Sequence, residues 1–367
     1  MRPQIIHVIT GLGVGGAEMV LYNLLSGLDS NDRHRHLVVC LGARDKMGDK
    51  ICALGVNVEY LDMPKGHPTI KGLLGLIKIF RASGNPIIQG WLYHGNLAAS
   101  CAALLSFRSY KLFWSIHNSL TRLESEKPLT RLIIYLLRFI SFLPQKIIYV
   151  AKLSAEQHEG IGYRKSRTIL IPNGYDTNVF KPNPDARGWL RKELAIPDEV
   201  KVIGVVGRWD WSKDYQNFLS ALALVEGAHG VLIGTDMNGH NQALCDNIKD
   251  AGVGARVHLM GYRDDVPILM AGFDILCLSS RAEALPNVVG EAMACGVPCV
   301  VTDVGDVAEL VAGTGWICVP QNYIELSQCL NEALVSDLLS YSNAARMRVE
   351  KNYSYTKMIN VYKCLYD

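Results

Sequence analysis

Residues 4–18 read QIIHVITGLGVGGAE, and residues 201–214 read KVIGVVGRWDWSKD. Each stretch begins with a short apolar run rich in β-branched residues and passes into a turn that contains glycine. Such a run is typical of a strand buried on both faces of a parallel sheet. The same pattern therefore begins twice, once near the first residue and once past the middle of the chain.

Short apolar runs alternate with longer helical patterns after each of these starts. Further strands are expected at residues 36–41, 86–89, 111–116, 146–150, 230–234, 256–260, 274–278 and 298–302. Strand–helix alternation predicts parallel sheets covered on both faces. Residues 171–184, with Pro172, Gly174, Pro182 and Pro184, form a natural linker. We therefore predict an α/β protein with two doubly wound Rossmann-like domains that face each other across a cleft, where ligands bind beyond the carboxyl ends of the strands.

Composition is that of a globular protein, with 49% apolar and 20% charged residues in a chain of 367. The charge is divided unevenly. Residues 1–180 hold 21 Lys and Arg against 12 Asp and Glu, whereas residues 181–367 hold 16 against 23. This asymmetry predicts two modules with different partners. A nucleic-acid-binding protein usually gathers its basic residues in one recognition element, and no such element stands out in this sequence. We therefore expect no nucleic-acid partner.

The ten cysteines include no CxxC pair, and most lie in apolar stretches. We interpret them as core residues of a protein in a reducing compartment, without a zinc or disulfide framework. No signal-peptide pattern follows Met1. The longest apolar stretch, residues 132–150, is interrupted by Arg138, Pro144 and Lys146, which excludes a membrane span. We expect a cytoplasmic protein.

The first glycine-rich turn contains the pattern GxGxxG at Gly11, Gly13 and Gly16. Dinucleotide-binding proteins with this pattern carry an acidic residue about 20 positions further on, but residues 34–36 here are His-Arg-His. A narrower interpretation is a phosphate site at a helix N-terminus. A tight turn that simply requires glycine is equally compatible with the motif.

Two cations follow the first strand of the second half. Arg208 and Lys213 come after a strand end, where both can project over the edge of the sheet. A fixed pair of cations there would neutralise a diphosphate without a metal. The alternative is solvated surface charge, with Asp210 and Asp214 as the partners of these cations.

Residues 279–298 read SSRAEALPNVVGEAMACGVP, with seven residues between Glu283 and Glu291. On one helix the two glutamates would lie about 80° apart. We therefore place Glu283 in a loop and Glu291 in a helix whose first turn contains Pro286. A carboxylate at position 291 can accept hydrogen bonds from two sugar hydroxyls.

Taken together and in this order, these motifs resemble glycosyltransferase family 4, whose members are retaining enzymes of the GT-B fold. The resemblance rests on Gly15-Gly16-Ala17-Glu18, on Pro172-Asn173-Gly174 with Asp176 and Phe180, on Gly207-Arg208 with Lys213, on residues 261–266 (GYRDDV), on Glu283 with Glu291, and on Gly296-Val297-Pro298. It covers nearly the whole chain.

The resemblance implies a role for each residue of the motifs. Glu291 would hold the ribose hydroxyls and Glu283 a hydroxyl of the donor sugar, while Arg208 and Lys213 would stabilise the leaving diphosphate. The implied catalytic residues are Glu283, Arg208, Lys213 and His117. The implied donor-binding residues are Gly15, Gly16, Arg208, Lys213, Tyr262, Arg263, Glu283, Leu285, Pro286, Asn287, Val288 and Glu291. No metal and no cofactor are expected, because the cations take the metal's role.

Two features concern substrate choice. The family usually has glycine and then an aromatic residue after the first glutamate, whereas this chain has Ala284 and Leu285. This departure affects the identity of the donor sugar more than the reaction.

On the acceptor side, His117 matches a family histidine at the reaction centre, and His94 is similarly placed. A strand-end histidine that contacts only local backbone is the alternative for His117.

The family's domain plan assigns acceptor binding to residues 1–180 and nucleotide-sugar binding to residues 181–350, with residues 351–367 as a helix that crosses back onto the first domain. Residues 69–81 and 122–152 combine basic and apolar residues at helical spacing. Such segments can lie on an anionic membrane, although ordinary core-facing helices have the same pattern. We therefore expect a protein that is peripheral at the inner face of the plasma membrane.

The leading hypothesis is a retaining transferase that moves a hexose or N-acetylhexosamine from a nucleotide sugar, with UDP favoured. Its acceptor would be a sugar linked to polyisoprenyl diphosphate, in bacterial surface-polysaccharide synthesis. Three alternatives remain open: a small soluble acceptor, an NAD(P)-dependent oxidoreductase, and a silent sugar-binding paralogue.

Overall fold

The computed structural model describes residues 4–13, 15–64, 69–121 and 123–367. Val14 of the glycine loop and Arg122 of the second basic segment lie outside the described residues. The chain divides into two compact units. Unit 1 comprises Met1–Gly174 with Tyr355–Asp367, and unit 2 comprises Tyr175–Ser354.

Unit 1 is built on a seven-stranded sheet in which every strand pair is parallel. In spatial order the strands are β3 (Asn57–Tyr60), β2 (His36–Cys40), β1 (Ile5–Ile9), β4 (Ile87–Trp91), β5 (Lys111–Ile116), β6 (Lys146–Tyr149) and β7 (Thr168–Leu170). The chain runs outward from β1 to β3 and then returns to the other side of β1 for β4. The strand order therefore reverses between β1 and β4.

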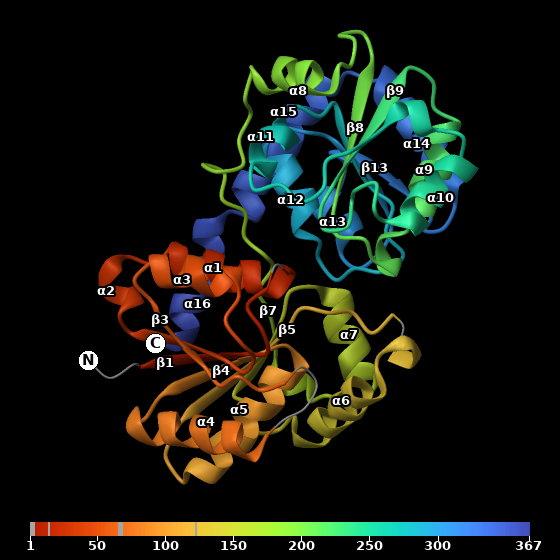
Figure 1. Cartoon of the computed structure of the whole chain (residues 1–367). Helices are drawn as coiled ribbons and strands as arrows, with labels where there is room; N and C mark the ends of the chain where they lie inside the picture. Colours follow the sequence, from red (N-terminus) through yellow and green to blue (C-terminus); the bar gives the residue numbers. More distant parts are fainter. Residues whose placement is uncertain (1–3, 14, 65–68, 122) are drawn as a thin grey trace. The chain divides into compact units, whose positions relative to one another are not determined.

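Helices cover both faces of this sheet (Figure 1). One face carries α1 (Gly16–Ser26), α3 (Lys46–Ala53) and α16 (Tyr355–Tyr366), with the short α2 (Ser30–Arg33) nearby. The other carries α4 (Ile70–Ala82), α5 (Leu92–Ser106), α6 (Pro128–Ile140) and α7 (Lys152–Gly160). Short 3-10 turns at Leu123–Ser125 and Lys165–Arg167 complete the unit.

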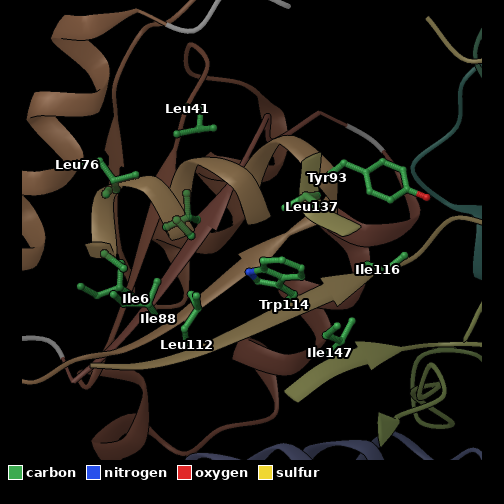
Figure 2. Close-up of a cluster of buried hydrophobic side chains, with 14 of the residues drawn as sticks. Ile6, Leu41, Leu76, Ile88, Tyr93, Leu112, Trp114, Ile116, Leu137 and Ile147 are labelled. Atoms are coloured by element: carbon green, nitrogen blue, oxygen red, sulfur yellow. The ribbon is translucent and has the colours of Figure 1, made fainter. Parts of the chain in front are cut away.

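The core under α4, α5 and α6 is apolar and closely packed. Figure 2 shows Ile88 of β4 and Leu112 and Trp114 of β5 on the face of the sheet where Leu137 of α6 also lies. Trp114 is fully buried, and its indole N–H donates to Ser100 Oγ over 3.0 Å. The largest core side chain on this face therefore has its polar atom satisfied inside the protein.

The last helix, α16, belongs to unit 1 and not to the unit that precedes it in the chain. It buries Met358, Ile359, Tyr362 and Tyr366 against the α1 face. Polar contacts hold both of its ends. Tyr355 shares a hydrogen bond of 2.6 Å with Ser26, and Lys363 forms an ion pair of 2.7 Å with Asp32.

Unit 2 repeats the architecture with six parallel strands. Their order is β10 (Val257–Leu259), β9 (Ala228–Ile233), β8 (Lys201–Val206), β11 (Ile275–Leu278), β12 (Cys299–Thr302) and β13 (Gly315–Cys318). Here the strand order reverses between β8 and β11.

The helices of unit 2 also form two layers (Figure 1). One layer contains α9 (Tyr215–Ala223), α10 (Gln242–Asp250) and α14 (Tyr323–Val335). The other contains α8 (Ala186–Leu194), α11 (Val266–Ala271), α12 (Asn287–Ala294), α13 (Val307–Val311) and α15 (Leu338–Asn352). Two 3-10 turns, Trp211–Lys213 and Gly254–Arg256, lie in the connections.

Each strand expected from the sequence is present, with ends within two residues of the prediction. Three strands were not predicted: β3, β7 and β13. All three lie at an edge of their sheet. Strand β3 (NVEY) alternates between exposed and half-buried residues and lacks a continuous apolar run. Strands β7 (TIL) and β13 (GWIC) are apolar but only three and four residues long.

In the basic and apolar segment 122–152, the described residues form helix α6 (Pro128–Ile140) and then the expected strand β6 (Lys146–Tyr149). One other expectation needs correction. The cysteines are less uniformly internal than predicted: five are buried, but Cys52 and Cys364 are exposed.

Candidate functional site

The topology of unit 2 decides where a ligand can bind. Strands β8 and β11 are neighbours, but the chain leaves them toward opposite faces, through α9 and α12. The connections that follow them, residues 207–214 and 279–286, therefore begin side by side at the carboxyl edge of the sheet. In open α/β sheets this reversal point is where ligands bind.

The first connection folds into a tight turn that presents two cations. The hydroxyl of Tyr215 donates to the carbonyls of Gly207 and Arg208, over 2.9 and 3.1 Å. Asp210 caps the 3-10 turn through the N–H of Ser212 (2.9 Å). Arg208 extends into solvent, with 63% of its side chain exposed, and its Nε lies 3.4 Å from Asp210.

The structure brings Lys213 and Glu283 together, although 70 positions separate them in the chain. Lys213 Nζ lies 2.6 Å from Glu283 Oε1, in a pair that is mostly shielded from solvent. Ser280 Oγ donates to the same oxygen over 2.9 Å. Thr302 Oγ1 in turn donates to the carbonyl of Ser280 over 2.7 Å, so β12 supports the loop that carries Glu283.

Of the two aspartates expected to pair with Arg208 and Lys213, only one does so. Asp210 does pair with Arg208. Asp214, however, does not pair with Lys213: its carboxylate lies 2.6 Å from Arg281, a residue that the sequence did not single out. Arg281, Ser280 and Thr302 have no distinctive local pattern, so only the folded chain reveals their contacts.

A glycine in the loop after β12 shapes the backbone beside Glu283. Gly305 has a positive φ of 58°, and a Cβ there would lie 2.3 Å from the carbonyl oxygen of Ala284. The N–H of Asp306 donates to that same oxygen over 3.0 Å. Residue 305 must therefore be glycine for the two loops to approach this closely. Ala284 and Leu285, the two departures from the family pattern, are both buried.

Glu283 lies in the loop and Glu291 in helix α12, so the predicted loop-plus-helix arrangement is confirmed. One detail differs: Pro286 is the N-cap residue of α12 and not part of its first turn. Asn287 and Val288 open the helix and are half-buried. Gly290 packs against the ring of Tyr175, where a Cβ would come within 2.0 Å.

Burial raises the pKa of Glu291 to about 7. At neutral pH this carboxyl is therefore poised between its two protonation states. As a carboxylate it offers acceptors for two hydroxyl donors. A carboxylate held in partly dry surroundings is also a stronger acceptor than one in water.

The loop after β10 holds the remaining predicted donor residues of unit 2. The hydroxyl of Tyr262 donates to Asp264 over 2.9 Å, while much of its ring stays exposed. Arg263 is already engaged: it contacts Asp265 at 2.8 and 2.6 Å and Glu193 at 3.1 Å. The guanidinium of Arg263 thus joins this loop to α8.

The predicted residues of unit 1 share one edge of its sheet. Gly15 caps α1 and Gly16 begins it, directly after β1. His94 lies in the first turn of α5 after β4, and His117 follows β5. Because β1, β4 and β5 are consecutive in the sheet, these connections leave the same carboxyl edge.

The surroundings of His117 keep it neutral. Its ring stacks on Trp91 with centroids 5.3 Å apart, and Nε2 lies 3.0 Å from Ser115 Oγ. Burial lowers the pKa of His117 to about 3. Burial also lowers the pKa of His94. A neutral imidazole with so low a pKa can position a hydroxyl but is a weak proton acceptor.

The raised pKa of Glu291 predicts an unusual stability profile. Between its ordinary value of 4.5 and about 7, the folded chain keeps a proton that the unfolded chain releases. The free energy of unfolding therefore falls as pH rises through this interval. Glu291→Gln removes the titration, so without nucleotide we expect this variant to be more stable than the wild type at pH 8, by about 1–3 kcal/mol.

Thermal unfolding at pH 8 and at pH 4.5 measures this effect, which should vanish at the lower pH. Glu332→Gln, on an exposed position of α14, is the matched control and should change stability by less than about 0.5 kcal/mol at either pH. A Glu291→Gln protein less stable than the wild type at pH 8 would contradict the assignment.

Sequence profiles of known families match both halves of the chain. The profile described as Glycosyltransferase Family 4 matches residues 14–179. The profile described as Glycosyl transferases group 1 matches residues 187–352. In the described part of the chain, no three His, Cys, Asp or Glu side chains form a group that could hold a metal ion.

Two curated relatives illustrate the range of similar enzymes. The N-acetyl-alpha-D-glucosaminyl L-malate synthase of Bacillus anthracis is 26% identical over 182 residues, which cover 48% of each chain, so the match spans about half of that relative. The N,N'-diacetylbacillosaminyl-diphospho-undecaprenol alpha-1,3-N-acetylgalactosaminyltransferase of Campylobacter jejuni is 28% identical over 341 residues. That alignment covers 88% of this chain and 89% of the relative.

Among solved structures, Alr3699/HepE of Anabaena, crystallised with UDP, has a TM-score of 0.86 and 22% identity, and the match covers 99% of both chains. Both halves of the chain thus match in order, and the fold is shared along its length. The chain belongs to glycosyltransferase family 4 and is a glycosyltransferase with the GT-B fold.

Proposed function

We propose that this glycosyltransferase takes a hexose or N-acetylhexosamine from a UDP-sugar and transfers it with retention of anomeric configuration to a lipid-linked sugar. The observation that carries the proposal is the clustering of two cations and a carboxylate at the reversal point of the unit 2 sheet. Arg208, Lys213 and Glu283 are the groups that a sugar diphosphate requires.

The Lys213–Glu283 ion pair is the resting state of the donor site. Each partner has a different target on a sugar diphosphate: the ammonium binds phosphate oxygens, and the carboxylate accepts a bond from a sugar hydroxyl. Donor binding therefore exchanges one internal contact of 2.6 Å for two contacts with the substrate. With Arg208, Lys213 supplies the positive charge that stabilises the leaving diphosphate, so we propose that no divalent metal is required.

Glu291 and Tyr262 would recognise the nucleoside. In this proposal the Glu291 carboxylate accepts bonds from both ribose hydroxyls, and the exposed ring of Tyr262 stacks on the base. Residues 285–288, at the N-terminus of α12, would lie against the phosphates, where every one of them except Pro286 has a backbone N–H. Gly15 and Gly16 of unit 1 stay predicted phosphate contacts.

Retention follows if the acceptor hydroxyl attacks from the side of the leaving group. The acceptor's proton then passes to the departing phosphate oxygen as the new glycosidic bond forms, and no protein base is needed. The low pKa of His117 supports this route, because a neutral imidazole of that acidity would remove a proton poorly. His117 and His94 would instead orient the acceptor.

The choice between a lipid-linked and a soluble acceptor rests on the surface of unit 1. By its name, the Campylobacter jejuni relative acts on a diphospho-undecaprenol-linked sugar, whereas the Bacillus anthracis relative uses L-malate. Both acceptor classes therefore occur among similar enzymes. The layer formed by α4, α5 and α6 favours the lipid-linked class, because these three helices contain no Asp or Glu.

Apolar and basic side chains gather on the outer surface of that layer. Helix α6 buries only Ile133, Ile134 and Leu137. Ile140 is half-buried against the core. The exposed apolar residues of the helix, with a phenylalanine just past its end, are Leu129, Leu132, Tyr135, Leu136, Phe139 and Phe142. Arg138 lies over the ring of Phe139, with 5.3 Å between its Cζ and the ring centroid. We propose that this layer lies on an anionic bilayer.

The described residues include no helix long and apolar enough to cross a membrane. The proposed association is therefore a surface contact, made by exposed side chains of α6 and of α4, where Ile70 and Leu74 are also exposed. Electrostatic attraction contributes to such binding, so it weakens as salt increases.

The proposed donor is tested by thermal unfolding with UDP, GDP, ADP and NAD(P). At 100 times its dissociation constant, UDP should stabilise the wild type by about 2.7 kcal/mol. Glu291→Gln should lose this effect, because an amide cannot replace the carboxylate that holds the ribose, while Glu332→Gln should keep it. Stabilisation by NAD(P) alone, or an equal UDP shift in all three proteins, would contradict the proposal.

Sedimentation with vesicles tests the proposed membrane contact. We expect the wild type to bind phosphatidylglycerol vesicles at low salt and to release them at high salt. Leu132→Ser combined with Phe139→Ser should weaken binding about tenfold or more, because both side chains are exposed and apolar. The control, Val335→Ser with Leu339→Ser, changes two exposed apolar residues of unit 2. Equal loss in both variants, or binding to neutral vesicles alone, would refute the assignment.

A further inference from the structure

A second ion pair joins the two loops that carry Lys213 and Glu283. Arg281 Nη2 lies 2.6 Å from Asp214 Oδ1. Asp214 directly follows Lys213, and Arg281 precedes Glu283 by two positions. Only 2% of the Asp214 side chain and 24% of the Arg281 side chain are exposed, so the pair is largely withdrawn from water.

Backbone groups strengthen the same junction. The N–H of Arg281 donates to the carbonyl of Ser212 over 2.7 Å. Ser279 Oγ donates to the carbonyl of Lys213 over 2.9 Å. The Arg281 guanidinium also lies over the Trp211 ring, with its Cζ 5.1 Å from the ring centroid. Arg281 thus contacts the first loop through both its backbone and its side chain.

Donor binding would affect the Arg281–Asp214 pair and the Lys213–Glu283 pair differently. Under the proposed function, Lys213 turns to phosphate and Glu283 to a sugar hydroxyl, so their mutual contact is lost. Neither Asp214 nor Arg281 has to move for that exchange. The Arg281–Asp214 pair is therefore an ion pair that can continue to join the loops while the donor is bound, together with the hydrogen bond from Ser279 to the Lys213 carbonyl.

The pair also has capacity for a second hydrogen bond. In the described part of the chain, Asp214 Oδ2 and Arg281 Nε are buried and have no hydrogen-bond partner. A guanidinium and a carboxylate can satisfy two such atoms by forming a two-bond fork. Lysine has a single ammonium and cannot form that fork or stack in the same way on an aromatic ring.

We propose that Arg281 and Asp214 are positioning residues that hold Lys213 and Glu283 in register on the bound donor. This inference rests on the proposed function. Neither residue touches the reacting atoms. Their effect is to fix the distance between the cation that stabilises the leaving group and the carboxylate that orients the sugar, a distance on which the rate of transfer depends.

Kinetics of Arg281→Met and Arg281→Lys test the proposal. The rate is measured as UDP release from a panel of UDP-glucose, UDP-galactose and their N-acetylated forms, with water as the acceptor of the sugar. Affinity is measured as the Kd of UDP by calorimetry. A misplacement of about 1 Å can lower a rate 100-fold. We expect kcat to fall about 10- to 100-fold in Arg281→Met and less in Arg281→Lys, while KM and the Kd of UDP change less than about threefold.

The control is Arg187→Met. Arg187 also pairs with an aspartate, with its Nε 3.5 Å from Asp274, but Asp274 precedes β11 and so lies at the opposite edge of the same sheet. This variant should keep kcat. A purely structural role for Arg281 would instead lower the unfolding temperature of Arg281→Met and leave the kcat of its folded fraction unchanged.

Arg281→Met alone leaves a buried carboxylate without its cation, which can prevent folding. The double variant Asp214→Asn/Arg281→Met removes both charges, and asparagine tolerates the left-handed backbone of residue 214, where φ is 50°. It should show the same loss of kcat as the single variant. Wild-type kcat in the double variant would overturn the proposal.

Two other outcomes separate a failure of the positioning role from a failure of the proposed function. A loss of UDP affinity in Arg281→Met that accounts for the whole loss of activity would make Arg281 a donor ligand and not a positioning residue. If the wild type itself neither binds UDP nor releases it from any of the four sugars, the proposed function fails, and the inference fails with it.

Discussion

The reversal of strand order between β8 and β11 is the constraint on which the rest of the site depends. Adjacent parallel strands whose chains depart to opposite faces leave an opening at their carboxyl edge. Residues 207–214 and 279–286 border this opening because the hydrophobic runs of β8 and β11 are buried side by side. Side chains 70 positions apart are brought to 2.6 Å by sheet topology.

Most of the charged groups of the candidate site are paired with one another. Lys213 and Glu283 neutralise each other, and Arg208 is balanced by Asp210. Among the described residues, Glu291 forms no ion pair, and burial raises the pKa of its carboxyl to about 7. Under the proposed function, each of these groups would exchange its present surroundings for contacts with a sugar diphosphate. The groups would then already be arranged before the substrate arrives, which is the condition for efficient electrostatic stabilisation.

Much of this architecture could be predicted from the sequence. Interior strands such as β8 were identified because burial on both faces requires a continuous apolar run. The placement of Glu283 in a loop and Glu291 in a helix followed from the spacing of the two residues and the geometry of a helix. Both predictions depend on information that is local in the chain.

Other features depend on contacts between distant segments and were not predicted. The edge strand β3 has no continuous apolar run, and the edge strands β7 and β13 are only three and four residues long. The partner of Asp214 was missed because Arg281 lies 67 positions away and has no local signature. The raised pKa of Glu291 follows from packing around α12, which sequence spacing does not reveal. The roles of the site residues and the functional division of the chain stay predictions.

A crystal structure of the protein with UDP tests the central claim most directly. The account predicts the diphosphate within hydrogen-bond distance of Arg208 and Lys213, the ribose hydroxyls on Glu291, and Lys213 withdrawn from Glu283. A nucleotide bound elsewhere, with the 2.6 Å contact between Lys213 and Glu283 intact, would contradict it.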